Sequence, residues 1–71
     1  MPLSGEQVIS VLRQAGFERV SQRGSHVKLR HPDGRTAIVP LHKELAPGTF
    51  ASVLRQAGIS GTEFDRLTDG K

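Results

Sequence analysis

The chain has 71 residues; 35% are hydrophobic, three are phenylalanine, and none is cysteine, tryptophan or tyrosine. This length fits one domain spanning residues 1–71, and a domain so small buries only about 60% of the surface that its unfolded chain exposes. The missing cysteines exclude disulfides, thiolate metal sites and a cysteine nucleophile. No apolar run reaches the roughly 18 residues of a membrane helix and no leader precedes residue 5, so we expect a cytoplasmic protein that does not bind membranes.

The net charge of +3 is unevenly distributed along the chain. Residues 19–43 carry six cations and one acid, a balance of +5, whereas the rest of the chain carries −2. All three histidines also lie in this basic segment. A basic stripe beside a mildly acidic body is typical of a protein that binds a phosphate backbone, although a solvated strand surface has the same composition.

Helical patterns flank the basic segment on both sides. Residues 4–7 form a capping box, and apolar residues at helical spacing follow as far as Gly16, the predicted left-handed cap. The second helix begins near Pro47 or Thr49 and ends at Gly58 by the same criteria. We therefore expect two amphipathic helices that each present one apolar face to a common core.

The end of the chain carries a third helical signal. A capping box at residues 60–63 opens a short helix, and residues 68–71 are expected to fray. The heptapeptide SVLRQAG, which occurs at residues 10–16 and again at 52–58, indicates two helices with the same ending rather than a repeat architecture.

Between the two longer helices the hydrophobic period changes from 3.6 residues to 2, which predicts strands. A tight turn at Arg23-Gly24 would pair Gln22 with Ser25 and bring Val20 opposite Val27. The strand before this turn would then place its apolar residue toward the helices.

A second hairpin is predicted at residues 31–35, where Pro32 and Gly34 suit a three-residue loop. This loop pairs Leu29 with Ala37. A two-residue loop at Asp33-Gly34 would instead turn the next isoleucine inward, but it requires proline to flank a primed turn, so we prefer the first register.

The predicted fold is α+β: a two-layer α-β-β-β-α arrangement, in which helices pack on one face of a three-stranded antiparallel meander and a short helix ends the chain. The covered face carries Val20, Val27, Leu29, Ala37 and Val39. The open face carries Arg19, Ser21, His26, Lys28, Arg30, Thr36 and Ile38. This parity gathers cations around one histidine.

Five short motifs follow one another over roughly residues 4–62: Gly24-Ser25-His26, Pro32-Asp33-Gly34-Arg35, Val39-Pro40-Leu41-His42, Gly48-Thr49 and Gln56-Ala57-Gly58-Ile59. In this order they resemble the HicA family. The resemblance implies a toxin of a toxin–antitoxin pair, an mRNA interferase that cleaves mRNA and inhibits translation, with a fold similar to double-stranded-RNA-binding domains. It also implies a HicB-type antitoxin as protein partner and His26 as the catalytic residue.

The chemistry of RNA agrees with a catalytic histidine. Because the 2′-hydroxyl is an internal nucleophile, cleavage requires a proton carrier near neutrality and cations for the developing charge, but no cofactor and no metal. Imidazole suits the first task. Lys28 and Arg30 lie two and four residues beyond His26, on the same side of the predicted strand, and suit the second. Without the resemblance, an ordinary solvent-exposed strand residue is the preferred interpretation of His26.

The other two histidines are weaker candidates. Strand parity places His31 on the face opposite His26, as an ordinary hairpin-end residue, and so argues against a three-histidine metal site. His42 follows the sheet and is either a second acid or base, a phosphate contact, or a positioning residue of its loop. Gly48-Thr49 either holds a phosphate on helix amides, with Lys43 nearby, or forms an ordinary cap.

The predicted RNA-binding residues are Arg19, Arg23, Ser25, Lys28, Arg30, His42 and Lys43. The phenylalanines are expected in the core, and no aromatic platform for bases is visible. Two other functions remain open: a non-catalytic RNA-binding module of the same fold, and a small protein-interaction domain whose basic face meets an acidic partner.

Overall fold

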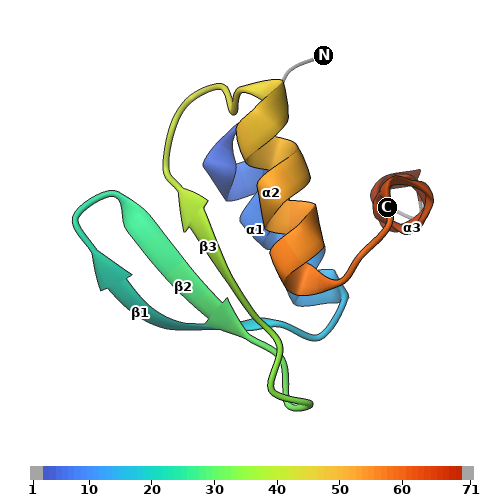
Figure 1. Cartoon of the computed structure of the whole chain (residues 1–71), viewed down its shortest axis with the longest axis horizontal. Helices are drawn as coiled ribbons and strands as arrows, with labels where there is room; N and C mark the ends of the chain where they lie inside the picture. Colours follow the sequence, from blue (N-terminus) through green and yellow to red (C-terminus); the bar gives the residue numbers. More distant parts are fainter. Residues whose placement is uncertain (1–2, 70–71) are drawn as a thin grey trace.

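The computed structural model describes residues 3–69 and has the predicted order of elements (Figure 1). Three strands form one antiparallel sheet in the order β1-β2-β3: β1 (Glu18–Arg23), β2 (His26–Arg30) and β3 (Thr36–Pro40). The helices are α1 (Gly5–Gln14), α2 (Pro47–Ala57) and α3 (Gly61–Asp69). The predicted α+β fold with a three-stranded meander is therefore confirmed.

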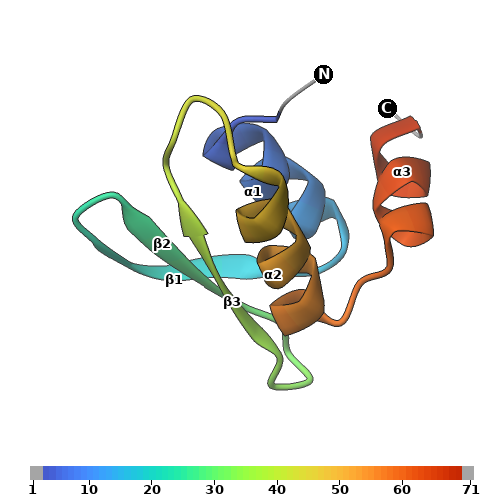
Figure 2. The same ribbon diagram turned by 45° about the horizontal axis from the view of Figure 1, so that its top comes forward.

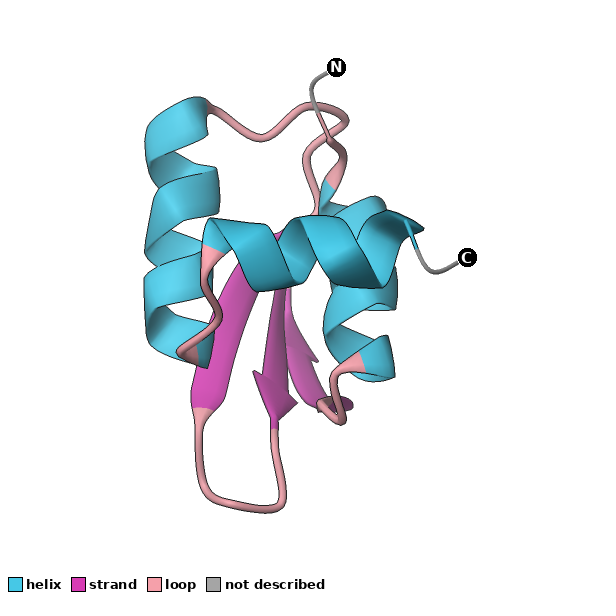
Figure 3. Cartoon of the chain, turned by 90° about the vertical axis from the view of Figure 1, so that its right-hand side faces the viewer, coloured by secondary structure: helices cyan, strands magenta, loops and turns pink. Residues whose placement is uncertain are grey.

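Helices α1 and α2 cover one face of the sheet, and α3 lies on the side of these helices that is remote from the strands (Figures 1 and 3). In Figure 3, α3 crosses in front of the other two helices and the strands lie behind them. Within residues 3–69 no helix covers the opposite face of the sheet (Figure 2). In the same range no helix has the length and the apolar character that a membrane span requires.

The helix ends follow the sequence signals. The Ser4 hydroxyl accepts from the Gln7 amide at 3.1 Å and the Ser4 amide donates to the Gln7 side chain at 2.8 Å, which completes the capping box. Gly16 and Gly58 follow α1 and α2 with φ of 103° and 66°. After each glycine, the next amide donates to a leucine carbonyl five positions earlier in the chain, so the repeated heptapeptide does end both helices in the same way.

The third helix is longer than predicted. It continues through Thr68, whose hydroxyl donates to the Phe64 carbonyl at 3.0 Å, and ends at Asp69. The predicted fraying at 68–69 is thus wrong, and the rest of that prediction lies outside the described residues. The Ser60 hydroxyl accepts from the Glu63 amide at 3.0 Å, which is one half of the predicted capping box.

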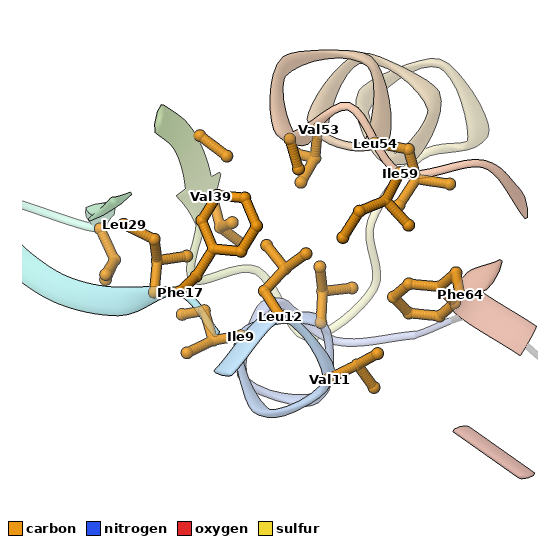
Figure 4. Close-up of a cluster of buried hydrophobic side chains, with 14 of the residues drawn as sticks. Ile9, Val11, Leu12, Phe17, Leu29, Val39, Val53, Leu54, Ile59 and Phe64 are labelled. Atoms are coloured by element: carbon orange, nitrogen blue, oxygen red, sulfur yellow. The ribbon is translucent and has the colours of Figure 1, made fainter. Parts of the chain in front are cut away.

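A single apolar core joins the sheet to all three helices (Figure 4). The helices contribute Val8, Ile9, Val11, Leu12, Val53, Leu54, Ala57 and Phe64; the sheet contributes Val27, Leu29, Ala37 and Val39; connecting segments contribute Phe17, Leu45 and Ile59. Full burial of a valine, leucine, isoleucine or phenylalanine side chain stabilises a fold by about 1.5–3 kcal/mol. Two phenylalanines lie in this core and Phe50 packs against it, with its ring 4.9 Å from that of Phe64.

The second hairpin has the predicted register. Leu29 pairs with Ala37 and Val27 with Val39, all four wholly buried, which rules out the alternative two-residue loop. Gly34 has φ of 99°, as the three-residue loop requires.

The first hairpin differs from the prediction, because its turn lies at Gly24-Ser25 and pairs Arg23 with His26. Primed turns need positive φ at their first central position. Gly24 occupies that position with φ of 59°, whereas the predicted turn would have forced Arg23 into it. The sequence-based pairing of Gln22 with Ser25 is therefore wrong, and Gln22 lies opposite Val27.

A bulge in β1 exchanges the faces of two predicted residues. The register shifts between Arg19 and Ser21, so that Arg19 pairs with Leu29 and Val20 is the extra residue. Val20 is 49% exposed rather than part of the covered face. Arg19 turns to the helix side, where its guanidinium lies 3.7 Å from the Glu6 carboxylate of α1. Both predicted placements, Val20 inside and Arg19 on the open face, are wrong for this reason.

Close contacts fix the sheet against the helices. The Gln56 side chain of α2 accepts from the Ile38 amide at 2.9 Å, so the outer edge of β3 is partly capped. At the start of α1 the chain passes so close to the end of β3 that a Cβ on Gly5 would overlap the Pro40 carbonyl oxygen. The Gly5 amide donates to the His42 carbonyl at 2.9 Å. Glycine is therefore required where α1 meets the segment after β3.

Candidate nucleic-acid interface

A shallow hollow of about 470 Å³ lies on the open face of the sheet. Its lining residues come from all three strands and are Ser21, Arg23, His26, Lys28 and Ile38. We call this set the sheet hollow. Arg23 and His26 of this set flank the Gly24-Ser25 turn that joins β1 to β2, so the hollow lies toward that end of the sheet.

The alternation of β2 places the histidine in the hollow. Along this strand Val27 and Leu29 are wholly buried against the helices, so His26, Lys28 and Arg30 face the open side. His26 is exposed and Lys28 is partly buried. With a rise of about 3.3 Å per residue, the strand spaces these three side chains about 6.6 Å apart. The burial of two apolar residues thus determines where the polar ones lie.

The cations of this face have no acidic partners among residues 3–69. No carboxylate there lies within 4.0 Å of the side-chain nitrogens of Arg23, Lys28 or Arg30. Arg30 lies at the far end of β2, opposite Glu18 in the ladder, and lines a separate depression. The unpaired positive charge in the hollow therefore comes from Arg23, which lies opposite His26 in the ladder, and from Lys28, two residues beyond it on β2.

Two cations of the basic segment make contacts away from the sheet hollow. Arg35 donates to the Asp33 carboxylate at 2.8 Å and to the Ala57 carbonyl at 2.7 Å, and its guanidinium lies 5.3 Å from the Phe17 ring centroid. These contacts attach the second hairpin loop to the carboxyl end of α2, where a cation is favourable. Arg19 also lies on the helix side, where it donates to Gln22 at 3.0 Å. The structure therefore does not bring Arg19 together with the other predicted RNA-binding residues.

The segment after β3 reaches the same end of the sheet as His26. Pro40 pairs with His26, and the next amide, that of Leu41, donates to the Ser25 carbonyl at 2.6 Å. His42 and Lys43 follow directly and are exposed. Ser25, in the turn, is exposed as well. The predicted residues of this segment and of the turn thus lie beside the sheet hollow, although they do not line it.

His31 lies at the other end of β2, about 16 Å along the strand from His26. Its ring packs edge-on against Phe17, with centroids 5.2 Å apart, and its Nδ1 accepts from the Asp33 amide at 3.1 Å. These contacts agree with the prediction that His31 is an ordinary residue at the end of the hairpin. The amide of Arg35 donates to Asp33 at 3.0 Å, and this hydrogen bond, with the Arg35 guanidinium and His31 nearby, lowers the pKa of the Asp33 carboxyl.

The start of α2 differs from the predicted cap at Gly48-Thr49. The N-cap of α2 is Ala46, without a side-chain hydrogen bond, so Gly48-Thr49 lies inside the first turn and is not the cap. Among residues 3–69 no three His, Asp or Glu side chains are grouped to hold a metal ion.

Sequence reasoning placed Ser21 and Ile38 on the open face but did not include them in the site. Strand parity was the signal that could have included them, because both share a face with His26. Strand parity determines the face of the sheet on which a side chain lies. Which side chains of β1 and β3 lie close to His26 on that face depends on the register across the hairpins.

The fold and this face define a small α+β protein with an exposed histidine beside cations, on a face of the sheet that no helix within residues 3–69 covers. A family model described as the HicA toxin of bacterial toxin-antitoxin matches residues 5–59. Because this match covers more than half of the chain, the protein belongs to the HicA toxin family. Membership supports a toxin function and implies a partner from a toxin–antitoxin system. No curated protein sequence matches the chain.

Proposed function

We propose that this protein is the toxin of a HicA/HicB-type pair and acts as a metal-independent endoribonuclease that cleaves mRNA and thereby inhibits translation. The observation that carries the proposal is the sheet hollow, in which the exposed His26 lies together with Arg23 and Lys28. Both cations lack carboxylate partners among residues 3–69.

The mechanism follows from the order of these side chains. Phosphates of the RNA bind to Arg23, Lys28 and Arg30 on the open face, which brings one ribose to His26. Neutral His26 accepts the proton of the 2′-hydroxyl while the 2′-oxygen bonds to phosphorus and the bond from phosphorus to the 5′-oxygen breaks. The products are a 2′,3′-cyclic phosphate and a free 5′-hydroxyl.

Two further groups complete this reaction. Lys28 and Arg23 stabilise the negative charge that grows on the phosphorane, because both line the same hollow as His26. The leaving 5′-oxygen takes a proton from water or from His42, the second histidine at this end of the sheet. His42 is thus a candidate acid, and its contribution is smaller than that of His26 if water substitutes.

The protein partner in this proposal is a HicB-type antitoxin that covers the sheet hollow. The unpaired cations there suit an acidic surface, and a domain of this size gains stability from any partner that binds only its folded state. Masking of the hollow would prevent RNA from reaching His26.

The test is cleavage of mRNA by the purified protein in EDTA. We expect cleavage with cyclic-phosphate or 3′-phosphate ends, and we expect His26→Ala to lower the rate about 10²–10⁴-fold, the range for loss of a general acid or base. His31→Asn is the matched control, because it removes a histidine but keeps an acceptor for the Asp33 amide. Full activity of His26→Ala would refute the assignment.

The same experiment separates the alternative function. A non-catalytic RNA-binding module would bind RNA in a salt-dependent manner and leave it intact. A protein-interaction domain would show no affinity for RNA even at low salt.

A further inference from the structure

We propose that Ile38 holds a nucleobase of single-stranded RNA next to His26, and that the sheet hollow therefore takes RNA with an unstacked base. This inference rests on the proposed function and specifies its substrate class. Ile38 is here a positioning residue: it contacts the base and has no part in proton transfer.

The first observation is that Ile38 is a large apolar side chain in a polar site. It is 45% exposed, and its neighbours in the hollow are Ser21, Arg23, His26 and Lys28. Within residues 3–69 the only other large exposed hydrophobic side chain is Val20, which lies in the β1 bulge outside this hollow. Covering Ile38 with an apolar surface would remove exposed hydrocarbon from water.

The second observation is that the position of Ile38 is fixed. It pairs with Lys28 across the ladder, and its amide donates to the Gln56 side chain at 2.9 Å. Its flanking residues Ala37 and Val39 are wholly buried. The exposed side chain is therefore held at the edge of the hollow by the sheet and by α2, which suits a rigid contact with a ligand.

The surrounding charges determine what the ligand is. Arg23 and Lys28 attract phosphates, and a base attached to the same nucleotide chain is a flat, largely apolar group that can cover one isoleucine. An antitoxin that masks the hollow would also cover Ile38, but the RNA substrate must itself lie against His26 when the antitoxin is absent. The combination of one apolar side chain and neighbouring cations thus favours a nucleotide as the group that contacts Ile38 in the free toxin.

Contact with a base face requires single-stranded RNA. In an A-form duplex the faces of the bases are stacked on one another, and only base edges, 2′-hydroxyls and phosphates are accessible to a protein. A duplex could bind the cations of the open face but could not place a base on Ile38. The hollow therefore discriminates between single and double strands through this one side chain.

The test is a double-mutant cycle between Ile38→Ser and an abasic nucleotide, measured as binding in a His26→Ala background so that RNA is not cut. The probe is a short oligoribonucleotide that carries one abasic site, moved through each position in turn. At one position we expect the abasic site and Ile38→Ser each to weaken binding about tenfold, and the two changes together to weaken it no further. Ile38→Leu should restore most of the affinity.

Val20→Ser is the matched control, because Val20 is also β-branched and 49% exposed but lies outside the hollow. It should leave the affinity unchanged, and duplex RNA should bind with the same affinity to Ile38→Ser as to its parent. Thermal unfolding of each variant checks the fold.

Additive effects of Ile38→Ser and the abasic site at every position would overturn the inference, as would equal losses in Val20→Ser or no RNA binding in the His26→Ala background. Failure of the proposed function has a different signature. If the wild-type protein binds RNA with this coupling but never cleaves it, the base contact stands and the ribonuclease assignment fails.

Discussion

The clearest quantitative prediction concerns Lys28, which lies in the sheet hollow without a carboxylate partner within residues 3–69. In the proposed complex it neutralises one phosphate. Each neutralised phosphate of a single strand contributes about −0.7 to the slope of the logarithm of the binding constant against the logarithm of salt concentration. Lys28→Ala should therefore reduce the magnitude of this slope by about 0.7.

The structure also predicts how strongly RNA binding by the parent protein depends on salt concentration. Among residues 3–69, three cations without carboxylate partners face the open side of the sheet, namely Arg23, Lys28 and Arg30, so the parent slope should be about −2. A fourfold rise in salt would then weaken binding roughly 20-fold. Arg35 adds nothing to this slope, because its guanidinium is bonded to Asp33 and to the Ala57 carbonyl.

The assay is fluorescence anisotropy of a labelled oligoribonucleotide with His26→Ala protein over a series of salt concentrations. The matched control is Arg66→Ala, which removes a cation from α3, on the side of the helices remote from the sheet (Figure 1). An unchanged slope in Lys28→Ala, or an equal reduction in Arg66→Ala, would refute the assignment of the open face as the RNA surface.

Three further predictions concern the fold that holds this face. Gly5→Ala should destabilise the protein by about 1–3 kcal/mol in urea unfolding, because its Cβ would overlap the Pro40 carbonyl oxygen, whereas Gly48→Ala, with no atom within 4 Å of the new Cβ, should be neutral or stabilising. Leu29→Ala removes a wholly buried side chain and should cost about 2–5 kcal/mol in the same assay; a smaller loss would contradict the packing of β2 against the helices. The lowered pKa of Asp33 stabilises the folded state above the usual value of 3.8, and this contribution disappears as the pH falls through the lower pKa of the folded state. Thermal melts should therefore show that Asp33→Asn loses less stability than the wild type on acidification below about pH 4, and parallel pH curves for the two proteins would contradict the Arg35 contacts.

Local signals in the sequence were sufficient for most of the fold. The capping box at Ser4 and the glycines at the ends of α1 and α2 depend on contacts within a few residues, and the structure has them where the sequence indicates. The three-residue loop before β3 is equally local, since Pro32 and Gly34 determine its backbone conformation. The buried face of β2 and β3 followed from these turns.

The errors lie where two positions compete for the same turn. Arg23-Gly24 and Gly24-Ser25 are both two-residue turns that contain glycine, and the choice depends on which residue adopts positive φ. The bulge in β1 then moves Val20 out and Arg19 in, a change that no local pattern records, because it arises from fitting β1 to β2 and α1. One irregularity in an edge strand thus removed Arg19 from the proposed RNA surface.

The site was predictable to the extent that strand parity determines it. His26, Lys28 and Arg30 share a face because Val27 and Leu29 must be buried. The partners of Arg35 were not predictable, since its contact with the Ala57 carbonyl joins residues 22 positions apart in sequence. Residue composition alone therefore overestimated the number of cations available to a ligand.

The most direct test of the central claim uses one oligoribonucleotide with a cleavage site, and a second that carries a single 2′-deoxyribose at the cut position. We expect the wild-type protein in EDTA to cut only the first, leaving a 2′,3′-cyclic phosphate, and His26→Ala to cut neither at a comparable rate. Cleavage of the deoxy-substituted strand at the same bond would contradict attack by the 2′-hydroxyl, and undiminished cleavage by His26→Ala would contradict the role of this histidine.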